Sequence, residues 1–154
     1  KLKRKNYEVS INSAVKNLQD IAGIRVICSY VQDVYTIANL LVSQDDVHLV
    51  RMADYIREPK PNGYRSLHLI VEIPVFLSEG RILVPVEVQI RTIAMDFWAS
   101  LEHSLRYKAQ EYIPQHISDE LQRVATDIAS LDQRMQAIHD QVDELSDARS
   151  DNAT

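Results

Sequence analysis

The chain has 154 residues, enough for one domain with a sizeable core and hardly enough for two. Its 45% hydrophobic and 25% charged residues are typical of a soluble folded protein, and no apolar run is long enough to span a membrane. No signal-peptide pattern opens the sequence, and the single cysteine, Cys28, lies in an apolar stretch. These features favour a reduced thiol in a cytoplasmic protein.

Charge is distributed unevenly along the chain, whose net charge is −5. Residues 111–154 carry ten acidic and three basic side chains, whereas the residues before them are mildly basic. The basic residues cluster at positions 1–5, 57–65 and 106–108. Such compact clusters fit a polyanionic small molecule better than DNA or another long nucleic acid. The sequence starts at Lys1 rather than at a methionine, so we expect that an N-terminal part of the domain is missing.

The first half of the chain predicts helices and strands in alternation. Residues 12–19 have the pattern of a helix end, 22–30 of a strand, 31–43 of a helix and 47–56 of a second strand. Residues 59–63 then predict a turn, because each proline fixes φ and the Asn-Gly pair favours positive φ.

Two strands with clear alternation follow the turn, over residues 66–75 and 81–91. Each has an apolar face, expected to lie on helices, and an opposite face with ionisable groups near one end. The polar face of these two strands includes Ser66, His68, Glu72, Glu87, Gln89 and Arg91. Arg25 alternates with apolar neighbours in the same way, so three strands are expected to share one polar surface. The alternative is a half-solvated sheet without a site.

Two helices are expected in the remainder of the chain. The first, over residues 92–110, is capped by Thr92. Its expected apolar stripe consists of Ile93, Phe97, Trp98, Leu101 and Leu105. After Pro114, apolar residues from Ile117 to Leu145 follow one another in alternating steps of four and three, which predicts a helix with an unbroken heptad seam. The seam favours pairing with a helix of another subunit, and the alternative is a long helix lying on its own domain.

Together these elements predict an α+β fold. We expect a mixed β-sheet of about five strands flanked by helices, followed by a long C-terminal heptad helix.

Three short segments carry most of the residues suited to chemistry. They are Asp20-Ile21-Ala22-Gly23-Ile24-Arg25, Gly63-Tyr64-Arg65-Ser66-Leu67-His68 and Glu87-Val88-Gln89-Ile90-Arg91-Thr92. Two carboxylates on adjoining strands, Asp20 and Glu87, can hold Mg²⁺ together with substrate phosphates. Arg25 can neutralise phosphate charge or stack on a base, and Tyr64 can offer a flat surface to a purine.

In this order the three segments resemble the synthetase domain of the RelA/SpoT family, as does the later Phe97-Trp98-Ala99 with Glu102-His103-Ser104 and Tyr107-Lys108. The resemblance covers nearly all of residues 1–110. It implies a nucleotidyltransferase-like synthetase fold and the activity of a (p)ppGpp synthetase. Such an enzyme, a GTP pyrophosphokinase, transfers the β,γ-pyrophosphate of ATP to the ribose 3′-hydroxyl of GTP or GDP and releases AMP. The heptad helix directly after this region resembles the small alarmone synthetase branch.

The resemblance also implies roles for the matching residues. Asp20 and Glu87 would hold Mg²⁺, and Glu87 would take the proton from the ribose 3′-hydroxyl. ATP would be bound by Lys1, Arg4 and Arg25. The acceptor GTP or GDP would be bound by Lys60, Asn62, Tyr64, His68, Gln89 and Ala99.

Residues 1–110 are accordingly expected to be the catalytic domain and residues 111–154 a helical oligomerisation segment, with a homotetramer favoured. Binding of a regulatory alarmone or of RNA is compatible with this interpretation. The alternative is a catalytically inactive nucleotide- or RNA-binding regulator on the same fold. The chain departs from the family pattern at two positions: Ala53 stands where relatives often have a phosphate-binding arginine, and Asp96 where some have asparagine.

Overall fold

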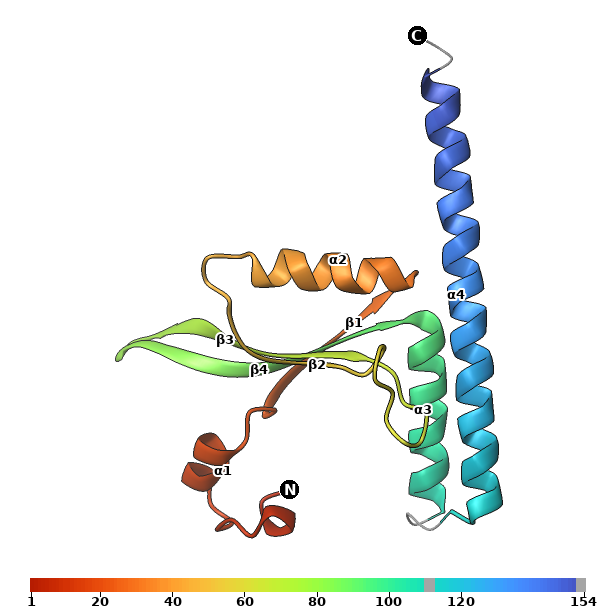
Figure 1. The fold of residues 1–154 in the computed structure, drawn as a ribbon. Coiled ribbons are helices and arrows are strands. Elements are labelled where there is room, and N and C mark those ends of the chain that lie inside the picture. Colours follow the sequence, from red (N-terminus) through yellow and green to blue (C-terminus); the bar gives the residue numbers. More distant parts are fainter. Residues whose placement is uncertain (110–112, 152–154) are drawn as a thin grey trace.

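The computed structural model describes residues 1–109 and 113–151 and has an α+β fold (Figure 1). The elements are η1 (Lys3–Lys5), α1 (Ile11–Asn17), β1 (Ala22–Cys28), α2 (Val31–Val42), β2 (His48–Asp54), β3 (Leu67–Leu77), β4 (Gly80–Thr92), α3 (Ile93–Lys108) and α4 (Gln115–Asp151). Each helix and strand expected from the sequence is present close to its predicted range. The expected domain boundary between residues 110 and 111 lies outside the described residues.

The strands form one mixed sheet in the order β1-β4-β3-β2. Strand β1 runs parallel to β4, whereas β3 pairs antiparallel with both β4 and β2. The described residues form a sheet of four strands, one fewer than the expected number of about five. The four are the segments in which the sequence itself shows strand patterns.

Helix α2 covers the apolar face of the sheet (Figure 1). Its buried residues Val34 and Ala38 pack into a core with strand residues such as Leu69 and Val88. Cys28 is buried in the same core, and this burial raises the pKa of its thiol. The core therefore covers one face of the sheet, and the opposite, polar face is not part of it. No helix among the described residues is long and apolar enough to cross a membrane.

Helices α3 and α4 run antiparallel beside one end of the sheet (Figure 1). Thr92 caps α3 as predicted, since its hydroxyl accepts a hydrogen bond from the Met95 amide. The predicted apolar stripe of α3 was wrong in its direction. Of its five residues only Trp98 is buried, and the covered face instead consists of Met95, Trp98, Ala99 and Glu102. Ile93, Phe97, Leu101 and Leu105 are exposed because α4 packs against the other face.

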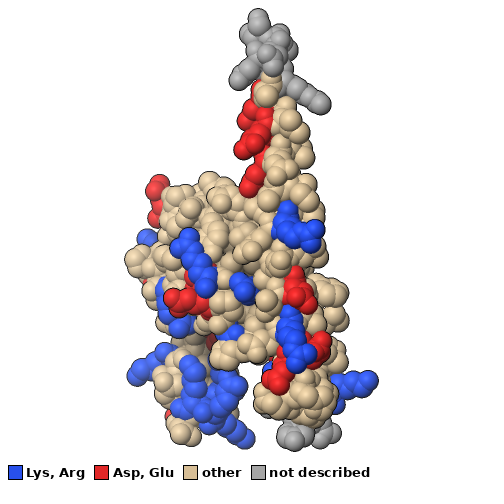
Figure 2. All heavy atoms as spheres, turned by 45° about the vertical axis from the view of Figure 1, so that its right-hand side comes forward, with Lys and Arg blue, Asp and Glu red and all other residues tan. Residues whose placement is uncertain are grey.

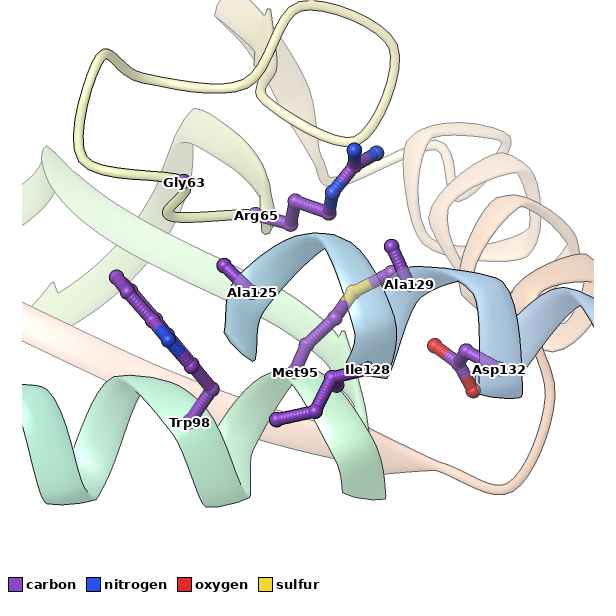
Figure 3. A pocket seen from close by; sticks show the side chains of 8 residues that line it. All are labelled: Gly63, Arg65, Met95, Trp98, Ala125, Ile128, Ala129 and Asp132. Carbon is purple, nitrogen blue, oxygen red and sulfur yellow. The ribbon is translucent and has the colours of Figure 1, made fainter. Parts of the chain in front are cut away.

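Helix α4 begins against the domain and then projects beyond it (Figure 1). Its Ala125 packs on Trp98 and Ala99, and Leu121 and Ile128 lie beside this cluster. Gly63, in the turn before β3, meets the same stretch of α4 (Figure 3). A Cβ atom at Gly63 would lie 2.5 Å from the Ala125 Cβ, and the φ of 88° also favours glycine. Part of the heptad seam thus packs on its own domain, which is the alternative considered from the sequence.

The rest of the heptad seam is left exposed by the residues that the structure describes. The exposed seam residues are Ile117, Val124, Leu131, Met135, Ile138, Val142 and Leu145. On the projecting part of α4 an acidic stripe runs beside uncharged residues (Figure 2). Helix α4 therefore packs on the domain around Ala125 and leaves a long apolar surface exposed.

Candidate functional site

The polar face of the sheet is assembled by strand register. Arg25 on β1 pairs with Gln89 on β4, and Gln89 pairs with His68 on β3, so the three side chains share one face. Glu87 lies two residues before Gln89 and pairs with Gly23 of β1. The prediction that three strands contribute to one polar surface is confirmed. In Figure 1 this surface lies opposite α2, between the N-terminal segment and α3.

Glu87 is held by neighbours on both of its carboxylate oxygens. Gln89 Nε2 donates a hydrogen bond of 2.9 Å to Oε2, and His68 Nδ1 lies 3.4 Å from Oε1. The His68 side chain is only 14% exposed. Burial lowers the pKa of its imidazole, and the charges of Lys60 and Arg91 act in the same direction, whereas Glu87 opposes them. Glu87 is thus a carboxylate whose orientation is fixed before any substrate arrives.

Tyr64 stands at the centre of the turn that enters β3. Its hydroxyl lies 2.8 Å from His68 Nε2, and Arg91 donates a hydrogen bond of 2.5 Å to the same hydroxyl. Lys60 Nζ lies 4.6 Å from the Tyr64 ring centroid and 4.5 Å from that of Tyr55, so the ammonium contacts both aromatic rings. The ring is therefore fixed by its hydroxyl and contacted by a cation that can pair with an anionic ligand.

The turn is also tied to α3 through a buried carboxylate. Asn62 Nδ2 donates a hydrogen bond of 3.0 Å to Glu102 Oε1, and Arg106 donates to the same oxygen. The Asn62 side-chain oxygen accepts from the Tyr64 amide at 3.2 Å. Asn62 therefore fixes the shape of the turn, because both the nitrogen and the oxygen of its side-chain amide are hydrogen-bonded.

Two hollows open on this face and meet at Arg25. One is lined by Gly23, Ile24, Arg25, Glu87 and Gln89. The other is lined by Arg25, Tyr64, Arg91, Ala99, Ser100, Glu102 and His103. The first hollow holds the Glu87 carboxylate and the second holds Tyr64 and Ala99. The structure thus brings Glu87 close to part of the predicted acceptor site, whereas Asp20, predicted for catalysis as well, lines neither hollow.

The residues predicted for ATP binding are more exposed. Lys1 forms an ion pair with Asp20, just before β1, and Arg25 NH1 lies 3.2 Å from Asp96 Oδ1. Arg4, in η1, has no side-chain hydrogen bond or ion pair within the described part of the chain. Lysines and arginines gather on the lobe below the sheet, and a hollow separates this lobe from the ends of α3 and α4 (Figure 2). The basic N-terminal cluster therefore borders the polar face without being fixed against it.

A family model described as a region found in RelA / SpoT proteins matches residues 1–112. The chain belongs to the RelA/SpoT family. It is 48% identical to the GTP pyrophosphokinase YwaC of Bacillus subtilis, over 93% of this chain and 68% of that protein. It is 42% identical to YjbM, a GTP pyrophosphokinase of the same organism, over 88% of this chain and 64% of that protein.

Among solved structures, the fold is similar to that of small alarmone synthetase 1 from Bacillus subtilis bound to its product pppGpp. The TM-score is 0.85 at 40% identity, and the match covers 92% of this chain and 71% of that one. The expected family and fold class are confirmed by these matches.

Three residues of this RelA/SpoT-family site were not assigned a role from the sequence. Arg91 is buried beneath Tyr64, Asp96 joins Arg91 to Arg25, and Glu102 anchors Asn62. Alternation had placed Arg91 on the polar face, but nothing in the sequence indicated its partners. Glu102 lies four residues before Arg106 on a helix, which was the only signal of an ion pair there.

Proposed function

We propose that this chain is the synthetase core of a GTP pyrophosphokinase. It transfers the β,γ-pyrophosphate of ATP to the ribose 3′-hydroxyl of GTP or GDP and releases AMP, forming the alarmone of the stringent response. The observation that carries the proposal is the oriented Glu87 carboxylate beside an aromatic, cationic turn, in a chain that is 42–48% identical to two GTP pyrophosphokinases.

In this proposal Glu87 acts as the general base. The 3′-oxygen of the acceptor attacks the β-phosphorus of ATP, its proton passes to Glu87, and the bond from the β-phosphorus to the oxygen shared with the α-phosphate breaks. The contacts from Gln89 and His68 support this role, since they hold the carboxylate in a fixed direction. Positioning and charge neutralisation supply most of the catalysis in phosphoryl-type transfer.

The two substrates would enter from opposite sides of the polar face. We assign the guanine base to the hollow with Tyr64 and Ala99, with Asn62 shaping the turn and Gln89 near the ribose. Lys60 and His68 would meet the acceptor phosphates. Lys1, Arg4 and Arg25 would bind ATP, in agreement with the basic character of the N-terminal lobe (Figure 2).

The residues present fit a divalent cation of the Mg²⁺ type. Asp20 and Glu87 offer carboxylate oxygens, the ligands that hard cations prefer. Asp20 lies two residues before β1, and Glu87, on β4, pairs with Gly23 of β1. No cluster of three or more histidine, cysteine, aspartate or glutamate residues that could hold a metal exists among the described residues, so substrate phosphates would complete the coordination. When bound, Mg²⁺ would neutralise charge that develops on the phosphates.

We further propose that residues 1–110 form the catalytic domain and that α4 joins copies of the chain into a homo-oligomer, with a tetramer favoured. The exposed seam of α4, from Ile117 to Leu145, supports this, because soluble monomers rarely leave so long an apolar surface in water. We also propose a cytoplasmic location, where ATP and GTP are available as substrates.

The decisive experiment is to incubate the purified chain with ATP, GTP and Mg²⁺ and to identify the nucleotides formed. Release of AMP together with a guanosine 3′-diphosphate product is expected. Release of pyrophosphate would indicate nucleotidyl transfer instead. Bound but unchanged nucleotides would favour the inactive regulator considered from the sequence.

A further inference from the structure

Arg91, the penultimate residue of β4, is the hub of the polar face although its side chain is buried. The residue is 4% exposed. Its guanidinium donates hydrogen bonds to Tyr64 Oη at 2.5 Å, Gln89 Oε1 at 2.9 Å, Asp96 Oδ1 at 3.1 Å and Ser66 Oγ at 3.3 Å. A buried cation needs partners, but a single carboxylate would satisfy most of that need. Here three of the four partners are residues that surround the proposed reaction.

Two arms of polar contacts lead from Arg91 to Glu87, and the second is hydrogen-bonded throughout. The first passes through Tyr64 Oη to His68 Nε2, and His68 Nδ1 lies 3.4 Å from Glu87 Oε1. The second passes through Gln89, whose Nε2 donates to Glu87 Oε2 at 2.9 Å. Both arms start at the guanidinium of Arg91, and each reaches a different oxygen of the Glu87 carboxylate.

The chemistry of the two ends fixes the direction of every link. A guanidinium can only donate, so Tyr64 Oη accepts from Arg91. An ionised carboxylate can only accept, so a neutral His68 beside Glu87 carries its hydrogen on Nδ1, and its Nε2 accepts the hydrogen of the Tyr64 hydroxyl. In the same way Gln89 must turn its oxygen to Arg91 and its NH₂ group to Glu87. Removal of Arg91 would free both the Tyr64 hydroxyl and the Gln89 side-chain amide to adopt other orientations.

A third contact ties Arg91 to the other side of the site. Asp96 Oδ1 accepts from Arg91 NH1 and also from Arg25 NH1, at 3.1 and 3.2 Å. Arg25 is the residue at which the two hollows meet. Arg91 is thus linked to the aromatic turn, to the carboxylate and to the cation proposed for ATP.

We propose that Arg91 is a positioning residue of the transfer reaction. It orients Glu87 through two arms and fixes the ring of Tyr64, without touching the reacting atoms. The inference rests on the proposed function, because the step that it serves is proton removal by Glu87. Its loss should therefore fall mainly on kcat, with a smaller loss of guanine-nucleotide binding because Arg91 also fixes the Tyr64 ring.

The test compares Arg91→Lys, Tyr64→Phe and the double variant in kcat and in KM for each nucleotide. Lysine keeps the charge but cannot reach both arms, so kcat should fall by about 10²-fold, the cost of a small misplacement of a catalytic group. Tyr64→Phe keeps the ring and cuts one arm, so kcat should fall by roughly tenfold with KM for GTP within about twofold. The double variant should be no slower than Arg91→Lys, because residues of one network are not additive.

Arg65→Lys is the matched control. Arg65 donates from NH1 to the Ile56 carbonyl at 2.9 Å, and no hydrogen bond or ion pair of the described residues joins it to Glu87. Its replacement should therefore lower the melting temperature and leave kcat within about twofold. GDP binding without Mg²⁺, measured by calorimetry, should weaken several-fold in Arg91→Lys and by no more than about twofold in Tyr64→Phe, where the Arg91 guanidinium can still contact the ring face. This second readout does not depend on turnover.

Arg91→Lys with a kcat within about threefold of the wild type, or a double variant whose losses simply multiply, would overturn the proposal. If Arg91→Lys fails to fold, Tyr64→Phe and Gln89→Leu cut the two arms one at a time, and an unchanged kcat in both overturns it equally. A wild-type chain that forms no AMP would contradict the proposed function itself, which separates the two failures.

Discussion

The polar face of the sheet and the long helix α4 differ in how far their side chains find partners within the described chain. On the polar face, Glu87, His68, Tyr64, Gln89 and Arg91 contact one another. On α4, most of the apolar seam is exposed in the described part of the chain. A surface whose groups already hold one another is ready to orient a ligand, whereas an unsatisfied apolar surface requires a partner to cover it.

The comparison predicts that damage to one surface should spare the other. Glu87→Gln is the sharpest change on the polar face, because it keeps the size of the side chain and removes its charge. General-base catalysis contributes about 10²–10⁴-fold, and loss of a metal ligand would add to this, so turnover should nearly disappear. The rate of AMP release measures the effect. Retention of more than about a tenth of the wild-type rate would remove Glu87 from its proposed role.

The matching change on α4 is Leu131→Asp combined with Ile138→Asp. Both residues are exposed in the single chain, at 54% and 52%, and burial of each in an assembly would contribute about 1.5–3 kcal/mol. Light scattering should show smaller species than for the wild type. The control is Gln133→Asp with Ala137→Asp, which adds the same charge at exposed positions outside the seam. A wild type that is already monomeric at micromolar concentration would contradict the proposed pairing.

Tyr64→Ala distinguishes the two substrates within the polar face. It deletes one stacking surface and one arm of the network, so guanine-nucleotide binding should weaken by about 1–3 kcal/mol while ATP binding changes little. Arg25→Ala should show the reverse preference. Calorimetric titration of each variant with GDP and with a non-hydrolysable ATP analogue gives the binding free energy of each nucleotide. Equal weakening of both nucleotides by Tyr64→Ala would place the acceptor elsewhere.

Strand alternation was enough to predict the polar face, because register and a period of two place Arg25, Gln89 and His68 in one row. The network around Arg91 could not be predicted in the same way. Its partners Tyr64 and Asp96 come from a turn and a helix, whose positions depend on tertiary packing.

Helix periodicity had a similar limit. It identified which residues of α3 and α4 are apolar, but not which of them the fold would cover. The α3 stripe was wrong for this reason: Phe97 and Leu101 are exposed, while Glu102 is buried with Asn62 and Arg106 as partners. On α4, by contrast, Leu121 and Ile128 pack inside the domain and Leu131 does not, although all three belong to one seam.

The smallest expected effect lies where the two surfaces meet. Asp132 of α4 is 6% exposed, and its Oδ2 accepts a hydrogen bond of 2.6 Å from the Thr92 hydroxyl. Burial raises the pKa of this carboxyl, and the hydrogen bond from Thr92 opposes the rise only in part. At neutral pH the ionised form is therefore less favourable in the folded chain than in the unfolded one. Asp132→Asn, which keeps an oxygen for Thr92, should stabilise the fold by less than about 1 kcal/mol.

The sign of the pH dependence follows from the raised pKa. The folded chain binds the Asp132 proton more tightly than the unfolded chain, so the wild type gains stability as the pH falls from 7 through the folded-state pKa. The advantage of Asp132→Asn should shrink over that range, and in melting temperature it should be at most about 4 °C at pH 7. Asp147→Asn, at an exposed position of α4, is the control and should show no such convergence. An advantage that grows on acidification would mean that Thr92 stabilises the charged form of Asp132 more than burial disfavours it.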